Sequence, residues 1–298
     1  MIYRHTCFAT TTSFGFGSRE TGRNVPVRIG LALGGGFARG IAHAGVLKVL
    51  EERNIPIHCV AGVSAGSVAA AAFSSGASAA EIAGIGSAMR FKDVARFSIN
   101  RLGFVNTERM ALFLQKLLKR FRFEDMRIPL GIVATDLATG EPVVFRDRGD
   151  VTTPLRASCS YPGLFQPVRD DARLLVDGSM SMAVPSLVCR ALGATHVISV
   201  NLPSPGWKSA GANFLNVVNR CIQIVQSRIV QDWRAASDIV ITPEVGSFGW
   251  NGFGNADQLI RAGEAAAREA VATIEGWISS PQPSSAVSRN VLCPAQLN

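Results

Sequence analysis

The chain of 298 residues has no stretch that is both long and apolar enough to cross a membrane. Its most apolar run, residues 29–50, carries Arg39, His43, Lys48 and six glycines, whereas a bilayer span needs ~20 largely apolar residues. The first 28 residues also lack the continuous apolar core of ~7 to 15 residues that a secretory signal requires. We therefore expect neither a transmembrane helix nor a secretory signal.

The sequence has few cysteines, and its acidic residues are fewer than its basic ones. Six cysteines are scattered without a C-x-x-C pair or a histidine at metal-ligand spacing, which argues against a disulfide framework and a zinc site. This usage predicts a reducing compartment, and we expect a cytoplasmic protein that contacts the membrane peripherally. Thirty Lys and Arg against 22 Asp and Glu give a net charge of +8, which favours anionic partners without choosing among lipid surfaces, nucleic acid and phosphorylated substrates.

Nucleotide-binding patterns are also missing from the glycine-rich stretch LGGGFARG, residues 33–40. A G-x-G-x-x-G pattern that starts at Gly34 meets Arg39 at its last position, and one that starts at Gly35 meets Phe37 at its second glycine. A P-loop fails as well, because no lysine follows Gly40. Three glycines before a helix leave bare N–H groups for an anion or a developing oxyanion, and a merely tight turn is the alternative.

Apolar runs alternate with helical patterns along most of the chain, which predicts an α/β fold of three layers with a mostly parallel central sheet. We expect one domain over residues 28–280, a flexible leader over 1–27 and a disordered tail over 281–298. The predicted strands cover residues 27–35, 57–63, 128–137, 141–146, 172–178, 196–202 and 237–245. The predicted helices cover residues 40–54, the segment from 64 onward, 77–89, 107–121, 184–193, 212–236 and 256–278.

Ser64 stands in a G-x-S-x-G pattern between a predicted strand and a predicted helix. Glycines on both sides let the backbone turn sharply, which lifts a serine side chain into a cleft. The helix that begins after Ser64 offers free N–H groups to an oxyanion. This pattern indicates a nucleophile, and a chance helix cap is the alternative.

The base that would accept a proton from Ser64 is not evident among the histidines. His5 lies in the leader, His43 lies within a helix, and His58 and His196 open strands, so structural roles are expected for all four. Asp177 ends a short apolar strand and precedes Gly178, a position that would present its carboxylate at the sheet edge. A turn aspartate is the alternative.

Taken together, GGGFARG, GVSAG, the block RASCSYPGLFQPV at residues 156–168, and the Asp177-Gly178 pair resemble the bacterial patatin-like phospholipase family. The resemblance covers roughly residues 28–245 and keeps the order of the family's four motifs. It implies that Ser64 is the nucleophile and Asp177 the base of a dyad without histidine. It also implies an oxyanion hole formed by Gly35 and Gly36, together with the N–H of Ala65 at the start of the helix.

The resemblance implies a serine acyl hydrolase that cleaves acyl esters of phospholipids, lysophospholipids or neutral lipids through an acyl-enzyme. No metal or cofactor is required, and no nucleic-acid partner is expected. Arg39 either steadies the glycine loop or contacts a phosphate. Two positions depart from the family pattern: Ser179 replaces Gly or Ala, and Met182 replaces a common Asn, which would alter the polarity of the pocket. A catalytically idle scaffold or regulatory adaptor is the alternative function.

Residues 101–122 form a basic, amphipathic segment. We consider two interpretations of its predicted helix: a surface that rests on a lipid interface, or a helix that packs its apolar stripe on the core. The apolar residues are Phe104, Met110, Phe113, Leu114, Leu117 and Phe121. The basic residues are Arg101, Arg109, Lys116, Lys119, Arg120 and Arg122.

Overall fold

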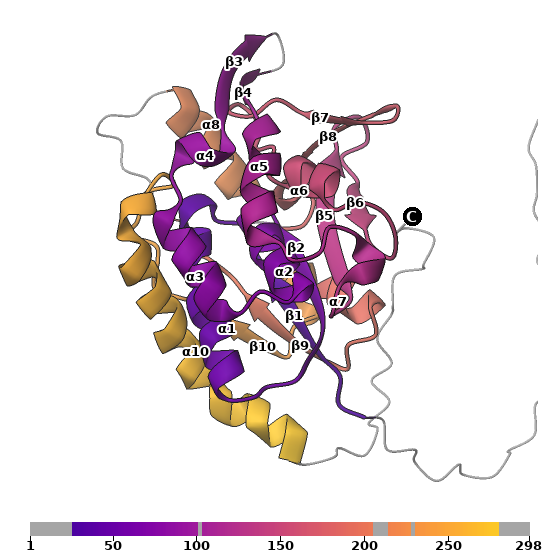
Figure 1. Cartoon of the computed structure of the whole chain (residues 1–298), viewed down its shortest axis with the longest axis vertical. Coiled ribbons are helices and arrows are strands. Elements are labelled where there is room, and N and C mark those ends of the chain that lie inside the picture. The colour runs from indigo at the N-terminus through magenta and orange to yellow at the C-terminus, as the bar shows by residue number, and fades with distance from the viewer. Residues whose placement is uncertain (1–25, 101–102, 205–213, 228–229, 280–298) are drawn as a thin grey trace, which may run out of the picture.

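The computed structural model describes residues 26–100, 103–204, 214–227 and 230–279 (Figure 1). The predicted leader and tail fall outside these residues, apart from Pro26 and Val27. Within the described part, no helix is long and apolar enough to cross a bilayer.

An eight-stranded sheet forms the centre of the fold. Seven strands follow the order β10-β9-β1-β2-β5-β8-β7, and β6 also pairs with β5. The five strands from β10 to β5 run parallel, so the predicted mostly parallel sheet is confirmed. These strands are β1 (Ile29–Leu33), β2 (Ile57–Val63), β5 (Leu130–Asp136), β9 (His196–Val200) and β10 (Ile239–Ile241).

The remaining three strands of the sheet run against their neighbours. They are β6 (Pro142–Phe145), β7 (Val168–Asp170) and β8 (Arg173–Asp177). A tight connection joins β7 to β8, and these two strands are antiparallel. β8 is also antiparallel to β5, its other neighbour. This direction brings the last residue of β8, Asp177, opposite Ala134 of β5.

Helices cover both faces of the sheet, as the three-layer prediction requires. Leu31 and Leu33 belong to a core cluster with residues of the helices on one face, whereas Ala32 and Cys59 pack with Val188 on the other. This alternation reflects the two-residue period of strands that are buried on both sides. The first face carries α1 (Ala42–Glu52), α2 (Ala65–Ser75), α3 (Ala79–Ala88), α5 (Glu108–Leu117) and α10 (Ala256–Ser279). The second carries α7 (Ser186–Ala191) and α9 (Val230–Ala235).

The remaining elements lie around the end of the molecule where β3 and β4 form a hairpin (Figure 1). They are α4 (Phe91–Val94), β3 (Arg96–Asn100), β4 (Gly103–Asn106), α6 (Thr152–Ser158) and α8 (Phe214–Gln226). The single long helix predicted over residues 212–236 is wrong in one respect, because the structure contains two separate helices there, α8 and α9.

The segment at residues 101–122 also differs from a single amphipathic helix. It contains β4, the ten-residue helix α5 and a non-helical stretch that starts at Leu118. The apolar stripe of α5 is buried in the core, with Leu114 fully covered. Lys119 pairs with Glu81, and Arg120 donates to the carbonyl of Ser75. This segment therefore packs on the core, as the second interpretation of the sequence states.

Helices α1 and α10 lie side by side along the same face of the sheet (Figure 1). Gly263 of α10 allows this close approach, because a Cβ atom there would lie 2.0 Å from the carbonyl oxygen of Ala42. Gly45 of α1 fulfils the same condition from the other side, with a Cβ position 2.0 Å from the Ile260 carbonyl oxygen. The two helices thus pack backbone against backbone at this crossing.

We expect Gly263→Ala to lower the free energy of unfolding by about 1–3 kcal/mol or more, because the added methyl group forces the two helices apart. Gly276→Ala is the matched control, since α10 has open space around Gly276. In that position alanine should instead stabilise the helix by about 0.5–1 kcal/mol. Urea denaturation of both variants measures the difference. A shift of the urea midpoint in the same direction for both variants would contradict this prediction.

Candidate active site

Strand register brings the three sequence motifs to one edge of the sheet. Leu33 at the end of β1 pairs with Gly62 of β2, and Val63 of β2 pairs with Val133 of β5. Asp177 lies opposite the next residue of β5. The three motifs therefore lie at the ends of nearby strands: the glycine loop follows β1, Ser64 follows β2, and Asp177 ends β8. Only β5 lies between β2 and β8 in the order of the sheet.

Ser64 lies in a strained turn between β2 and α2. Its backbone has φ 54° and ψ −128°, a conformation that L-residues rarely adopt. A Cβ atom on Gly66 would lie 2.2 Å from the carbonyl oxygen of Leu33, and one on Gly62 would lie 2.4 Å from Cα of Ser67. Both glycines of the pattern are thus required by close backbone packing. This is the geometry of a nucleophile elbow.

The glycine loop lies directly against the Ser64 turn. A Cβ atom built on Gly35 would be 3.2 Å from Cβ of Ser64. The backbone N–H groups of Gly35, Gly36 and Ala65 donate no hydrogen bond to another described residue. Three donors close to one hydroxyl are suited to a developing negative charge.

Arg39 and His43 hold the glycine loop in place. The Arg39 guanidinium is buried and donates from Nε to the Gly36 carbonyl (3.2 Å) and from one terminal nitrogen to the Pro203 carbonyl (2.7 Å). Burial lowers its pKa to about 10, so it stays charged at neutral pH. Burial lowers the pKa of His43 to about 4, so its ring is neutral, and Nε2 lies 2.9 Å from the Gly34 carbonyl oxygen, to which it donates.

The Asp177 carboxylate is fully buried, and no cation among the described residues pairs with it. One oxygen, Oδ1, accepts from the backbone N–H of Ser179 at 2.9 Å, and Oδ2 has no hydrogen-bond partner of normal geometry in the described part of the chain. Burial raises the pKa of Asp177 to about 6, against the opposing effect of the nearby Ser64 hydroxyl and of Ser179. Asp177 is therefore a stronger base than an exposed aspartate. The Ser64 hydroxyl is close enough to affect this pKa, although no fully formed hydrogen bond joins the two groups, as is common without substrate.

The block at residues 156–168 connects the two side chains. Ser158 accepts a hydrogen bond from the backbone N–H of Ser64 (2.9 Å), and the Ser160 carbonyl accepts one from the N–H of Asp177 (3.0 Å). Both serines are fully buried. The last residue of α6 and the segment that follows it thus fix the backbones of Ser64 and Asp177 relative to each other.

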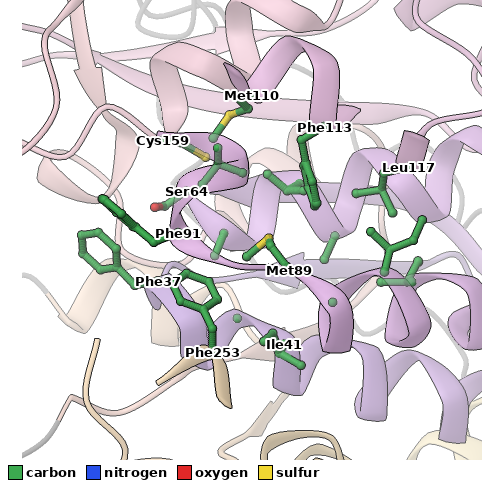
Figure 2. A pocket seen from close by; sticks show the side chains of 18 of the residues that line it. Phe37, Ile41, Ser64, Met89, Phe91, Met110, Phe113, Leu117, Cys159 and Phe253 are labelled. Carbon is green, nitrogen blue, oxygen red and sulfur yellow. The ribbon is translucent and has the colours of Figure 1, made fainter. Parts of the chain in front are cut away.

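Ser64 borders two pockets of opposite character. The first is a pocket of about 900 Å³, with its solvent-open mouth included, and its almost wholly apolar lining includes Phe91, Phe113 and Leu117. In Figure 2 the Ser64 hydroxyl lies beside Phe37 and Phe91, while Leu117 lies at the other end of the pocket. The second, of about 520 Å³, is lined mainly by polar groups. An apolar chain and a polar group can therefore lie on either side of one hydroxyl.

The structure brings every site residue predicted from sequence into this region: Gly35, Gly36, Arg39, Ser64, Ala65 and Asp177. None of the described histidines adjoins either pocket. The hydroxyl and N–H of Ser179 both approach Asp177. Met182 packs in the core cluster of the second face and does not line either pocket, so it does not alter their polarity.

Several contributors to the site were not predicted from sequence. The buried hydroxyl of Ser158 and the ring of Phe37 carry no local signal in one sequence, and the amide side chains of α8 come from a helix distant along the chain. Positive φ at Phe37 could not be inferred from the pattern of glycines around it.

Comparison with known proteins decides the family. A family profile described as patatin-like phospholipase matches residues 31–189, which include the glycine loop, Ser64 and Asp177. The chain belongs to the patatin-like phospholipase family. The sequence resemblance is thus confirmed at the level of the family, and the fold agrees with that of a solved relative. VipD from Legionella pneumophila superposes with a TM-score of 0.55 at 14% identity, over 86% of this chain and 71% of that protein.

Curated patatin-like relatives cover part of the chain. An uncharacterized NTE family protein of Mycobacterium tuberculosis is 34% identical over 187 residues, which is 62% of this chain and 51% of that protein. Lysophospholipase NTE1 of Mycosarcoma maydis is 33% identical over 184 residues, 59% of this chain and 10% of that protein. The aligned region thus spans about half, or less, of these relatives.

Metal ligands do not cluster in the part of the chain that the structure describes. No group of three or more His, Cys, Asp or Glu side chains there could hold an ion. The chemistry that the described residues offer is that of a hydroxyl, a carboxylate and N–H donors.

We expect the stability of the protein to depend on the ionisation of Asp177. Its folded-state pKa of about 6 lies above the ordinary value of 3.8, so the protonated form stabilises the fold below pH 4, and this contribution is lost as pH rises through 6. The loss amounts to about 3 kcal/mol at most. Asp177→Asn lacks this titration. Relative to the unsubstituted protein, its free energy of unfolding should rise by about 2–3 kcal/mol between pH 4 and pH 7. Urea denaturation at both pH values measures this, and a constant difference would contradict a raised pKa.

Proposed function

We propose that this chain is a lipid acyl hydrolase that cleaves fatty acyl esters through a Ser64–Asp177 dyad. The observation that carries this proposal is the position of Ser64. It stands on a strained elbow, beside a buried carboxylate with a raised pKa and at the edge of a large apolar pocket. Family membership and the curated lysophospholipase relative support a lipid ester as substrate.

In the proposed mechanism, Ser64 Oγ attacks the acyl carbonyl while its proton passes to Asp177. The N–H groups of Gly35, Gly36 and Ala65 stabilise the negative oxygen of the tetrahedral intermediate. The intermediate collapses, the C–O bond to the alcohol breaks, and Asp177 returns the proton to the leaving alcohol. A water molecule then attacks the acyl-enzyme, gives a proton to Asp177, and the fatty acid leaves as Ser64 is reprotonated.

The apolar pocket is the expected site of the acyl chain. Its lining is almost wholly apolar, as a site for a hydrocarbon chain requires. Phe91, Met110 and Phe113 line it, and they come from α4 and α5. The apolar stripe of α5 thus contributes to a substrate site rather than to a lipid-facing surface.

A catalytically idle scaffold is the alternative function. Such a protein would be free to lose the nucleophile, the base or the donors of the glycine loop. Here all three are present, and the buried, uncompensated charge of Asp177 destabilises the fold at neutral pH. A costly carboxylate at this position favours the enzyme.

Peripheral membrane contact is also part of the proposal, and α8 supplies the surface for it. Asn219, Gln223 and Gln226 on one side of α8 line the polar pocket. The opposite side exposes Val217, Ile224 and Val225, which are 48%, 44% and 58% accessible. This side of α8 thus exposes apolar residues where an ordinary surface helix exposes polar ones.

The exposed side of α8 suits an anionic lipid surface. Between Phe214 and Gln226 the helix carries Arg220 and no acidic residue. Gly163 packs against Val218 of α8, and Gln166 packs against β4, where Phe104 is 44% exposed. Apolar residues, basic charge and the pocket beside Ser64 thus occur together, as expected for an enzyme that takes its substrate from a lipid surface. A cytoplasmic location remains the corresponding proposal, in keeping with the free thiols of Cys59, Cys159, Cys189 and Cys221.

We expect Ser64→Ala and Asp177→Asn each to reduce hydrolysis of a p-nitrophenyl acyl ester by at least about 10³-fold, with the fold retained. In the unsubstituted protein, kcat/KM should fall about tenfold per pH unit below pH 6, because Asp177 must be ionised to accept a proton. His58→Gln serves as the control, since His58 lies near the start of β2 and lines neither pocket. If Asp177→Asn were as mild as His58→Gln, or if the Ser64→Ala protein stayed active, the dyad would be wrong.

We expect the double substitution Ile224→Asn, Val225→Asn to weaken binding to vesicles of phosphatidylcholine with 30% phosphatidylglycerol by about tenfold, because both apolar contacts with the bilayer are lost. Ile278→Asn is the control, since this exposed residue lies at the far end of α10 (Figure 1). Sedimentation measures binding, which should also fall with added salt. Unchanged binding by the α8 variant would overturn the proposal. If the variant instead abolished self-association in solution, α8 would be an interface between copies of the chain.

A further inference from the structure

Phe37 separates the apolar pocket from the polar pocket. Among the described residues, two line both of them, Ser64 and Phe37. Ser64 contributes the reacting hydroxyl, and Phe37 contributes an aromatic ring beside it (Figure 2). The boundary between the two pockets therefore consists of the proposed nucleophile and one large apolar side chain.

The backbone of Phe37 is strained. Its φ of 51° lies in the left-handed region, where glycine is comfortable and phenylalanine is not. Three glycines precede it, so a fourth would continue the loop without strain. A bulky residue in such a conformation indicates that its side chain has a role.

The ring of Phe37 is fixed by its neighbours. It packs edge-on against Tyr161, with ring centroids 4.8 Å apart, and against Trp250, with centroids 5.6 Å apart. Tyr161 in turn donates a hydrogen bond to Oδ1 of Asn219 on α8 (2.8 Å). The ring is thus a rigid partition rather than a side chain free to swing into either pocket.

The polar pocket beyond this partition is lined by groups that recognise hydroxyls. Tyr161, Ser179, Ser204, Asn201, Asn219, Gln223 and Gln226 line it together with Arg39. No hydrogen bond to another described residue uses the Gln223 side chain. Neutral amides and hydroxyls that both donate and accept match an alcohol with several hydroxyl groups.

We propose that the polar pocket binds the alcohol portion of the ester as a polyhydroxy leaving group, and that Phe37 is the specificity-determining residue that keeps this group apart from the acyl chain. The inference rests on the proposed function and adds the chemistry of the leaving group. With the acyl chain in the apolar pocket, the ester carbonyl lies at Ser64 and the alcohol oxygen points past Phe37 into the polar pocket. An apolar alcohol would leave the polar groups there unsatisfied.

Two esters of the same acid test this proposal. Glyceryl monodecanoate and propyl decanoate share the acyl chain and the three-carbon alcohol, and they differ by two hydroxyl groups. We compare kcat/KM for release of decanoate from each ester in mixed detergent micelles of one composition. The unsubstituted protein should prefer the glyceryl ester by about 10- to 100-fold.

Phe37→Gly removes the partition and suits the backbone conformation. The preference for the glyceryl ester should fall to within about threefold, because the alcohol of either ester can then lie in the apolar pocket. Asn54→Gly and Asp171→Gly are matched controls, since both residues have φ 51° and lie away from the pockets. They should keep the preference. Gln223→Met keeps the shape of a pocket residue without its amide and should lower the preference through the glyceryl ester alone.

The outcomes separate this inference from the proposed function. If the unsubstituted protein hydrolyses neither ester nor any other acyl ester, the proposed function fails, and the inference fails with it. If it hydrolyses both decanoates equally, or if Phe37→Gly and Phe37→Asn keep the full preference, the inference alone is overturned. Phe37→Asn covers the case in which the glycine variant does not fold, because asparagine tolerates positive φ. Circular dichroism establishes folding of each variant.

Discussion

The buried carboxylate of Asp177 is the constraint around which the site is built. A buried negative charge without a cation partner is unstable, and this raises the pKa of Asp177 to about 6. The sheet tolerates the cost because β8 is anchored on both sides of its last residue: Thr135 donates to the Asp177 carbonyl, and the Asp177 N–H donates to the Ser160 carbonyl. The backbone is thus fully satisfied, so the side chain alone carries the strain that a proton acceptor near neutral pH requires.

The buried positive charge of Arg39 is held by hydrogen bonds to neutral groups. Arg39 is buried with no carboxylate partner among the described residues, and its hydrogen bonds go to the Gly36 and Pro203 carbonyls and to the Ser204 hydroxyl. It therefore rigidifies the glycine loop while its positive charge remains uncompensated near Ser64. Such a charge favours a developing oxyanion without a direct contact. The loop-steadying role that the sequence analysis considered for Arg39 is thus compatible with an electrostatic one.

The fold and the sharp turn at Ser64 could be predicted because both depend on local patterns. Short apolar runs that alternate with helical segments define β1, β2 and β5. The two glycines around Ser64 define the elbow. The direction of β8 could not be predicted, since a five-residue strand has the same pattern in either orientation. The two pockets could not be predicted either, because they depend on long-range contacts. Their linings combine α4, α5 and α8 through contacts between residues far apart in sequence, and α8 in particular exposes apolar side chains where an ordinary surface helix exposes polar ones.

Two strained residues of the described chain lie where the two pockets meet. Ser64 and Phe37 both have positive φ, on two loops that follow neighbouring parallel strands. Each loop could relax if its residue were glycine, and each instead presents a side chain at the junction of the two pockets. The cost is sustained by close packing of the surrounding glycines, since a Cβ atom on Gly40 would lie 2.5 Å from Cβ of Ala65. Small residues bring the two loops together, so the Ser64 hydroxyl and the Phe37 ring lie side by side at this junction, as the proposed roles of nucleophile and partition require.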